Sequence, residues 1–177
     1  MKITFVRHTE VEESFVGKYN GHNDISLSAK GIEDAKELGE KLQNSSFDLV
    51  YASDLKRVQQ TLFYLNRDEK IISSSMLREK SWGKHEGMSF EEIVASGIKY
   101  ENFPQWLEAL DGERVEEYLE RLKEYFYGTI LIQDTQNILI VTHSGVIKSV
   151  FGFCRGLGIE DSFCIKLKYG EVVEVEC

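Results

Sequence analysis

The stretch KITFVRH, residues 2–8, is an apolar run that ends in an arginine and a histidine. The run Lys2–Val6 has the length of a single strand, and its composition predicts a strand that is buried. The stretch NILIVTHSG, residues 137–145, repeats this arrangement, because the apolar run Asn137–Thr142 leads directly into His143. We therefore predict two buried strands, each followed by a histidine at its carboxyl end.

Further strands and helices alternate along the chain. Ser28 and the capping box Ser89-x-x-Glu92 are signals for helix starts, and Ser53-Asp54 is a third candidate cap. The remaining predicted strands are Phe47–Ala52, Lys70–Ser73, and a closing hairpin of Phe163–Lys168 and Glu171–Glu176 turned at Tyr169-Gly170. The predicted helices run from Ser28 to Leu42, from about Leu55, from Ser89, over Phe103–Leu110 and Glu113–Tyr127, and over Val146–Arg155.

This alternation predicts an α/β fold, a three-layer sandwich with a mostly parallel sheet and helices on both faces. The length of 177 residues is enough for one complete hydrophobic core, so we expect a single domain over residues 1–177. The segment Leu77–Gly87 is predicted to be a polar loop. Residues 89–112 are long enough to cover the mouth of a site.

The charge balance of the chain disfavours two kinds of partner. The chain has 21 Lys and Arg against 30 Asp and Glu, a net charge of −9, which disfavours nucleic-acid or anionic-membrane binding because both need a basic face.

The apolar run at the N-terminus is too short for a signal peptide or a membrane span, so we expect a cytoplasmic protein. The Glu116–Glu124 charge run is predicted to be an exposed helix face. The oligomeric state is left open, with a homodimer as one alternative.

The residues that carry chemistry stand at the ends of predicted strands. Ligands of open α/β sheets bind beyond the carboxyl ends of the strands. Arg7 and His8 follow the first strand, Arg57 lies shortly after the second, and His143 follows the strand at residues 137–142. We therefore expect these four residues, distant in sequence, to converge on one site.

Their types point to phosphoryl transfer. Guanidinium groups bind phosphate oxygens in a bidentate manner, and helix starts near residues 53–57 and 144–146 would add backbone N–H donors. A neutral imidazole can attack phosphorus, while a second histidine stabilises the transferring oxygens. Glu79 is the candidate acid that protonates the leaving oxygen, and Glu86 is an alternative. This set needs no metal or other cofactor, because phosphoryl transfer depends mainly on positioning and charge. His22 and His85 are predicted to be surface or rim residues.

Five motifs resemble those of the histidine phosphatase superfamily, the phosphoglycerate mutase-like group, in the family's order over residues 3–150. Residues 7–11 (RHTEV) are similar to Arg-His-Gly-Glu/Gln-Thr, residues 17–31 (GKYNGHNDISLSAKG) to G-x-x-x-G-x-x-D-x-x-L-T-x-x-G, and residues 53–61 (SDLKRVQQT) to S-x-L-x-R-A-x-x-T. Residues 77–87 (LREKSWGKHEG) are similar to L-x-E-x-x-x-G-x-x-E-G, and residues 141–145 (VTHSG) to V-T-H-G-G. Each match is weak alone, but five in register make chance similarity remote.

The resemblance implies a phosphoglycerate mutase-like fold and a phosphomonoester hydrolase that acts through a phosphohistidine at His8. It places Arg7, Arg57 and His143 around the phosphate and makes Glu79 the proton donor. It also implies that four residues contact the substrate: Ser14, Asn20, Gly21 and Ser144.

Departures from the family pattern bear on the substrate. Thr9 and Ser144 replace glycines, Val11 replaces the threonine of the first motif, and Ser14 stands where many members have asparagine. Threonine after the nucleophile, together with the Gly-x-Tyr-x-Gly-x-x-Asp stretch at residues 17–24, is similar to the α-ribazole phosphatases of the cobalamin pathway. The leading substrate is therefore a small phosphorylated metabolite, α-ribazole 5′-phosphate.

Three other functions stay open. A phosphoglycerate mutase-type phosphotransferase is disfavoured, since the chain lacks the long insertion of true mutases and residues 79–83 read EKSWG instead of their Glu-Arg-His-Tyr-Gly. A protein phosphohistidine phosphatase would need a shallow, exposed site. A non-catalytic phosphate-binding module would have no use for the nucleophile and acid that His8 and Glu79 provide.

Overall fold

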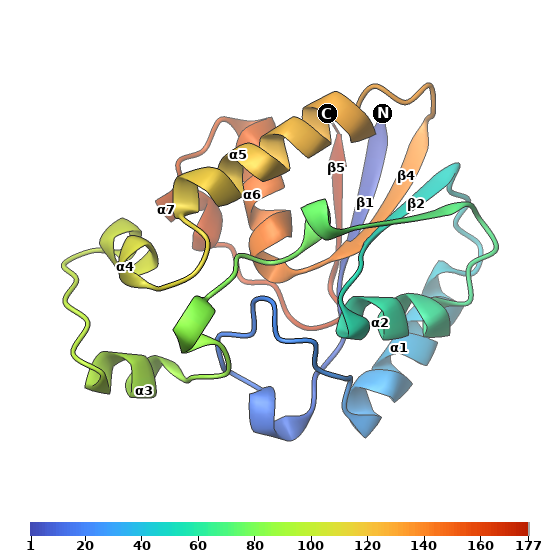
Figure 1. The fold of residues 1–177 in the computed structure, drawn as a ribbon. Helices are drawn as coiled ribbons and strands as arrows, with labels where there is room; N and C mark the ends of the chain where they lie inside the picture. The colour runs from blue at the N-terminus through green and yellow to red at the C-terminus, as the bar shows by residue number, and fades with distance from the viewer. Residues whose placement is uncertain (177) are drawn as a thin grey trace.

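The computed structural model describes residues 1–176, which form a five-stranded sheet in the order β3-β2-β4-β1-β5 (Figure 1). The strands are β1 (Lys2–Arg7), β2 (Leu49–Ser53), β3 (Ile71–Ser74), β4 (Asn137–Thr142) and β5 (Val172–Glu176). β1 to β4 are parallel, and β5 is antiparallel to β1. The fold is the predicted mostly parallel α/β sandwich, and the carboxyl ends of β2, β4 and β1 lie side by side.

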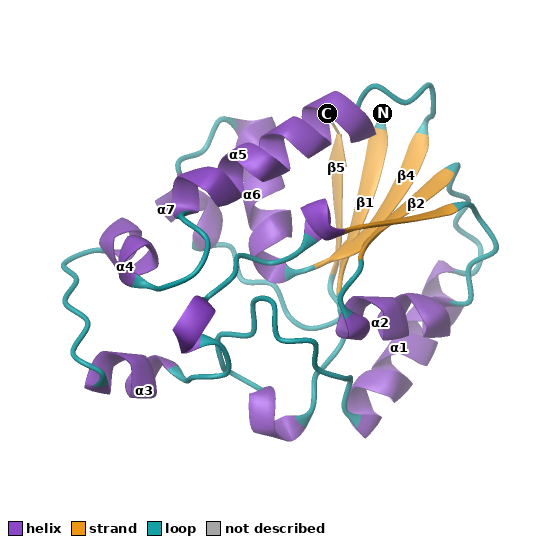
Figure 2. Ribbon diagram, in the orientation of Figure 1, coloured by secondary structure: helices purple, strands orange, loops and turns teal. Residues whose placement is uncertain are grey.

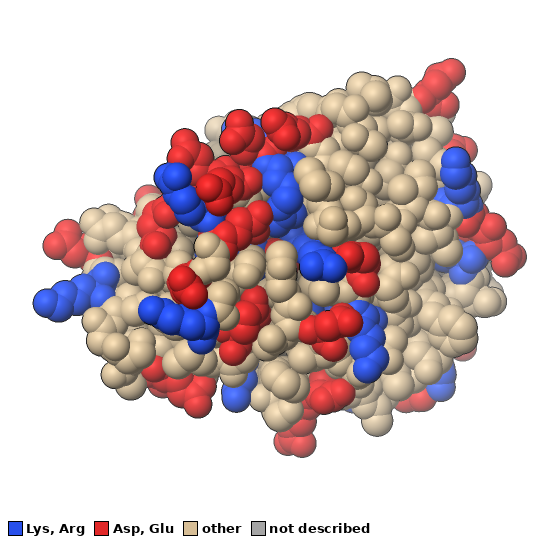
Figure 3. Space-filling model, in the orientation of Figure 1, with Lys and Arg blue, Asp and Glu red and all other residues tan. Residues whose placement is uncertain are grey.

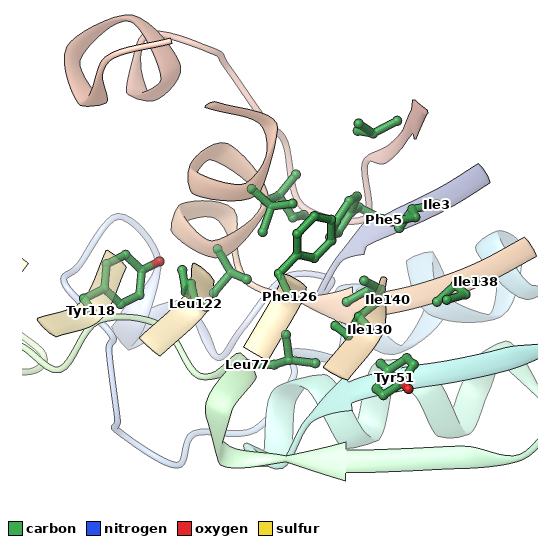
Figure 4. Close-up of a cluster of buried hydrophobic side chains, with 14 residues drawn as sticks. Ile3, Phe5, Tyr51, Leu77, Tyr118, Leu122, Phe126, Ile130, Ile138 and Ile140 are labelled. Atoms are coloured by element: carbon green, nitrogen blue, oxygen red, sulfur yellow. The ribbon is translucent and has the colours of Figure 1, made fainter. Parts of the chain in front are cut away.

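Helices cover both faces of this sheet (Figure 2). α1 (Ala29–Leu42) and α2 (Lys56–Leu65) lie on one face, and α5 (Val115–Tyr125) and α6 (Ser144–Arg155) lie on the other. Alternate strand side chains point to opposite faces, so Ile3 and Phe5 pack with α5 and α6, whereas Val6 packs with α1 and α2. Figure 4 shows the first of these clusters, in which Leu122 and Phe126 meet the strands. Both layers of the core therefore fix the positions of the strand ends.

The segment between β3 and α5 extends beyond the carboxyl ends of the strands (Figure 1). It contains α3 (Phe90–Ala95) and α4 (Phe103–Ala109), and it has a buried core of its own around Trp82, Ile93 and Trp106. The remaining helix is α7 (Ile159–Phe163). Shorter turns are the 3₁₀ helices Glu13–Phe15, Ser75–Leu77 and Gly83–His85 and the π-helical turn Phe126–Ile130.

Two of the predicted helix caps are confirmed, and the third is wrong. The Ser28 side chain accepts a hydrogen bond from the Gly31 amide, and Ser89 and Glu92 form the reciprocal capping box. The N-cap residue of α2 is Leu55, which has no polar side chain to cap the helix, and the Asp54 carboxylate accepts from Arg78 instead.

The predicted closing hairpin is also wrong in its first strand. Residues 159–163 form α7, and 165–168 have no regular structure, although a turn does occur at Tyr169-Gly170. β5 pairs with β1 instead, so its partner lies about as far away in sequence as the chain allows.

The acidic side chains of the charge run at residues 116–124 lie on α5, and they are exposed, as the sequence predicts. Acidic side chains gather over α5 in Figure 3, where Glu116, Glu117, Glu120 and Glu124 are exposed. In the described part of the chain, no helix combines the length and the apolar character that crossing a bilayer requires.

Candidate active site

A cavity of about 410 Å³ opens at the carboxyl ends of β1, β2 and β4. The five residues predicted to carry the chemistry all line it: Arg7, His8, Arg57, Glu79 and His143. Pairing of β1 with β4 brings the two histidines together, since Arg7 is in register with Thr142 and the next residue of each strand is a histidine. Their ring centroids are 5.3 Å apart, edge to face.

His8 is held in one tautomer. It is 6% exposed, and its Nδ1 lies 2.8 Å from the carbonyl oxygen of Thr9. A carbonyl oxygen only accepts, so Nδ1 carries the hydrogen and Nε2 keeps its lone pair. Burial lowers the pKa of His8 well below its usual value, and the positive charges of Arg57 and Arg7 lower it further. The ring is therefore neutral at physiological pH, with Nε2 free as a nucleophile.

His143 is oriented by β2. Its Nε2 lies 2.9 Å from Oγ of Ser53, while its Nδ1 is buried without a hydrogen-bond partner. In the tautomer in which the Ser53 hydroxyl donates to Nε2, the ring hydrogen lies on Nδ1, where it is a donor for a bound group. Burial, Arg57 and His8 all lower the pKa of His143.

The Arg57 guanidinium is 1% exposed and is held by backbone carbonyls. Nη1 donates to Asn23 at 2.7 Å, and Nη2 donates to Asn20 and Gly21, each at 2.8 Å. Its Nε is buried and unpaired, which leaves a donor for an anion in the cavity. Burial lowers the pKa of Arg57 to about 10, so the group remains a cation at neutral pH.

Glu86 holds the loop that supplies those carbonyls. Its carboxylate accepts from the amides of Gly21 at 2.8 Å, His22 at 2.7 Å and Trp82 at 2.9 Å. The sequence offered Glu86 as an alternative acid, but it does not line the cavity. Glu86 instead holds in place the loop backbone whose carbonyl oxygens accept hydrogen bonds from the Arg57 guanidinium.

Glu79 lies between α5 and the start of α6. Oε2 accepts from the Gly145 amide at 2.8 Å, and Oε1 accepts from the Tyr118 hydroxyl at 3.1 Å. Gly145 permits this approach, since a Cβ there would lie 2.2 Å from Oε1 of Glu79. The carboxyl group is thus oriented from two elements while it lines the same cavity as His8.

The predicted substrate contacts divide into two groups. Asn20 and Ser144 line the cavity. Gly21 does not line the cavity; its carbonyl oxygen instead accepts a hydrogen bond from the Arg57 guanidinium. Ser14 lies on the exposed 3₁₀ turn Glu13–Phe15 and is not brought to the cavity.

Thr9, His22 and His85 each form hydrogen bonds with other groups of the protein. The Thr9 amide donates to Oγ1 of Thr61 at 3.1 Å, and the Thr9 hydroxyl lies 3.3 Å from the same oxygen, so the buried hydroxyl beside His8 has a polar partner. His22 Nε2 lies 3.1 Å from the Glu79 carbonyl oxygen. The prediction that His85 lies at the surface or rim is wrong: the residue is buried, and its Nδ1 accepts from the Asp111 amide at 3.0 Å.

Aromatic side chains form one wall of the cavity. Tyr19, Trp82 and Phe90 line it, and Trp106 packs behind them with its Nε1 donating to the Tyr19 hydroxyl at 2.9 Å. Of the predicted cover, residues 89–112, only Phe90 reaches the cavity. Lys18 and Tyr169 line the cavity as well. Sequence reasoning assigned no site role to Tyr169 or to Tyr118, whose hydroxyl donates to Glu79, because neither tyrosine lies in a motif.

Within residues 1–176, no group of three or more His, Cys, Asp or Glu side chains is placed to hold a metal ion.

Known proteins resemble this chain over nearly its full length. An adenosylcobalamin/alpha-ribazole phosphatase of Escherichia coli (strain K12) is 28% identical over 96% of this chain and 87% of the relative. Phosphoserine phosphatase 1 of Hydrogenobacter thermophilus is 28% identical over 90% of this chain and 78% of the relative. The crystal structure of the alpha-ribazole phosphatase from Shigella flexneri superposes with a TM-score of 0.86 at 28% identity, covering 99% of this chain and 90% of that one. Residues 3–177 match the histidine phosphatase superfamily (branch 1), and the chain belongs to that superfamily.

Proposed function

We propose that the protein is a phosphomonoester hydrolase in which His8 carries the phosphoryl group. Nε2 of His8 attacks phosphorus, the bond from phosphorus to the ester oxygen breaks, and Glu79 gives its proton to the departing alkoxide. Water then attacks the phosphohistidine, Glu79 takes up a proton from that water, and the P–N bond breaks. The products are an alcohol and inorganic phosphate, and His8 returns to its neutral form.

The observation that carries this proposal is the state of His8. Its Nδ1 is occupied by the Thr9 carbonyl, and its remaining nitrogen belongs to a neutral ring in a cavity lined by two arginines. Nε of Arg57 and Nδ1 of His143 are buried donors without a partner. Buried polar groups are generally paired, so unpaired donors around one cavity support an anionic ligand there.

The leading substrate is α-ribazole 5′-phosphate. The named relatives include alpha-ribazole phosphatases, and the aromatic wall of Tyr19, Trp82 and Phe90 matches a leaving group with a flat benzimidazole ring. Offset stacking on such a wall would orient the ribose and its phosphate toward His8. We propose a small metabolite in the cytoplasm as the partner, as the sequence predicts.

A second candidate substrate is O-phosphoserine. Lys18 lines the cavity, and no ion pair of its ammonium occurs among the described residues. That cation could bind a substrate carboxylate, and one relative is a phosphoserine phosphatase.

The first experiment measures phosphate release from p-nitrophenyl phosphate in the presence of a chelator. Wild type is expected to turn over and His8→Ala to be inactive, with acid-labile phosphate trapped on the wild-type chain only. Undiminished turnover by His8→Ala would refute the role of His8. Phosphate binding without any turnover would favour a non-catalytic module, and dependence on a bisphosphorylated primer would favour a mutase.

The second experiment compares kcat/KM for α-ribazole 5′-phosphate, O-phosphoserine and 3-phosphoglycerate. Phe90→Ala should lower kcat/KM for the ribazole ester selectively, and Lys18→Met should lower it for the carboxylate-bearing esters. A panel in which α-ribazole 5′-phosphate is not hydrolysed would refute that substrate and leave the phosphatase reaction in place.

A further inference from the structure

The turn before β5 is fastened directly to the segment that carries the nucleophile. The Gly170 amide donates to the His8 carbonyl at 3.3 Å, and the Arg7 amide donates to the Glu171 carbonyl at 3.0 Å. Nη1 of Arg7 donates to the Leu167 carbonyl at 2.5 Å. Gly170 has a φ of +67°, a conformation that favours glycine and closes the turn. Residues 167–171 therefore enclose Arg7 through both its backbone and its side chain.

Tyr169, at the tip of this turn, covers the Arg7 guanidinium. The Arg7 Cζ lies 4.1 Å from the centre of the Tyr169 ring. The same ring is 5.6 Å from the His8 ring and lines the cavity. One aromatic side chain thus contacts both the proposed nucleophile and an arginine beside it.

We propose that Tyr169 is a positioning residue that fixes the plane of the Arg7 guanidinium for the transferring phosphoryl group. This inference rests on the proposed phosphatase function. The hydrogen bond to Leu167 fixes one edge of the guanidinium, but it leaves rotation about that bond free. Stacking on the Tyr169 ring removes this freedom, and a planar fork must lie in one plane to bind two phosphate oxygens.

The donors that remain on Arg7 agree with this role. Its Nε is buried and has no hydrogen-bond partner, so the fork still has capacity for an anion. Tyr169 itself is only partly buried and lies outside the hydrophobic clusters of the sheet. Its ring lies against the Arg7 guanidinium and the His8 ring, which are groups of the site and not of the sheet's core.

The test compares Tyr169→Phe, which keeps the ring, with Tyr169→Leu, which removes it. Tyr127→Leu is the matched control, since Tyr127 is an exposed tyrosine remote from the cavity. We expect Tyr169→Leu to lower kcat/KM for p-nitrophenyl phosphate about tenfold and to weaken inorganic vanadate binding in parallel. We expect Tyr169→Phe to lose less than about threefold, because stacking persists. Thermal midpoints check the fold, and Tyr169→Gln replaces the leucine variant if it fails to fold.

A double-mutant cycle with Arg7→Lys decides whether Tyr169 acts through Arg7. Lysine keeps the positive charge but has no planar group that a ring could orient. In the Arg7→Lys background, Tyr169→Leu should therefore lower kcat/KM by less than about threefold. An equal loss in both backgrounds, or equal losses for the Phe and Leu variants, would overturn the inference while the phosphatase function stands. If wild type shows no turnover, the proposed function fails, and vanadate affinities across the same cycle still decide the role of Tyr169.

Discussion

The carbonyl oxygen of Thr9 lies 2.8 Å from Nδ1 of His8, the residue immediately before it. Nδ1 donates its hydrogen to this carbonyl, so the lone pair of Nε2 is available as a nucleophile. It depends on backbone alone, so the side chain at position 9 is free to pack against Thr61. Tautomer and charge of the proposed nucleophile are therefore set by two different features, the local backbone and the surrounding arginines.

The ionisation of His8 gives the first prediction. Because burial and both arginines lower its pKa, His8 should stay neutral below pH 6.5, and the acid limb of kcat/KM should lie below that value. A pH titration of the imidazole ring signals by NMR measures the same quantity in the free protein. His8→Gln identifies the signal. Protonation of His8 at or above pH 6.5 would contradict the electrostatic account.

Protein stability should fall on acidification for the same reason. The pKa values of buried His8 and His143 are lowered, so the unfolded chain takes up protons below about pH 6.5 before the folded protein does. Their contribution is fully present above about pH 6.5 and is lost as the pH falls toward the folded-state values. Urea denaturation at several pH values between 7.5 and 5 measures this slope. It should be shallower in His143→Gln, which removes one of the two groups.

Glu79→Gln tests the proposed acid. Loss of a general acid typically costs ~10²–10⁴-fold, but only where the leaving group needs a proton. The loss of kcat should therefore be large for an alkyl phosphate and small for p-nitrophenyl phosphate, whose phenolate leaves readily. Initial rates on the two substrates give this ratio. Equal losses on both would move the acid role to another residue.

Tyr118→Phe should reproduce this pattern on a smaller scale. Burial and the nearby Glu79 carboxylate raise the pKa of Tyr118, so its hydroxyl remains a donor to Oε1. Loss of one such hydrogen bond is worth ~1 kcal/mol, or about fivefold in kcat for an alkyl phosphate. In the Glu79→Gln background the same change should have little further effect. Tyr125→Phe on the same helix is the matched control.

The sheet and most of the site could be predicted from sequence because they depend on local patterns. Apolar runs that end in Arg7-His8 and in His143 determine both the strands and the placement of the two rings, since parallel neighbours end at the same edge. Tyr169 could not be found in this way, as its contact with Arg7 spans most of the chain. The predicted hairpin failed for the same reason: β5 satisfies its backbone hydrogen bonds with β1, which no local signal encodes.

The Gly145→Ala variant tests whether activity depends on the close contact between the start of α6 and the Glu79 carboxyl group. An added Cβ would lie 2.2 Å from Oε1 and 2.9 Å from the carboxyl carbon of Glu79, so the carboxyl group has to move. The Gly145 amide donates to Oε2 at 2.8 Å, and that bond would lengthen as well. A displacement of about 1 Å at a reacting group can cost ~10²-fold, so we expect a loss of kcat between tenfold and this figure on an alkyl phosphate.

Helix propensity makes the outcome informative. Alanine favours a helix over glycine by ~1 kcal/mol, so the fold of α6 should not suffer, and a loss of activity would report on Glu79 alone. Gly158→Ala is the control, because nothing lies within 4 Å of the Cβ it would add. Both variants should keep the thermal midpoint near that of wild type. Full activity in Gly145→Ala would mean that Glu79 tolerates displacement, which a proton donor fixed by Gly145 and Tyr118 should not.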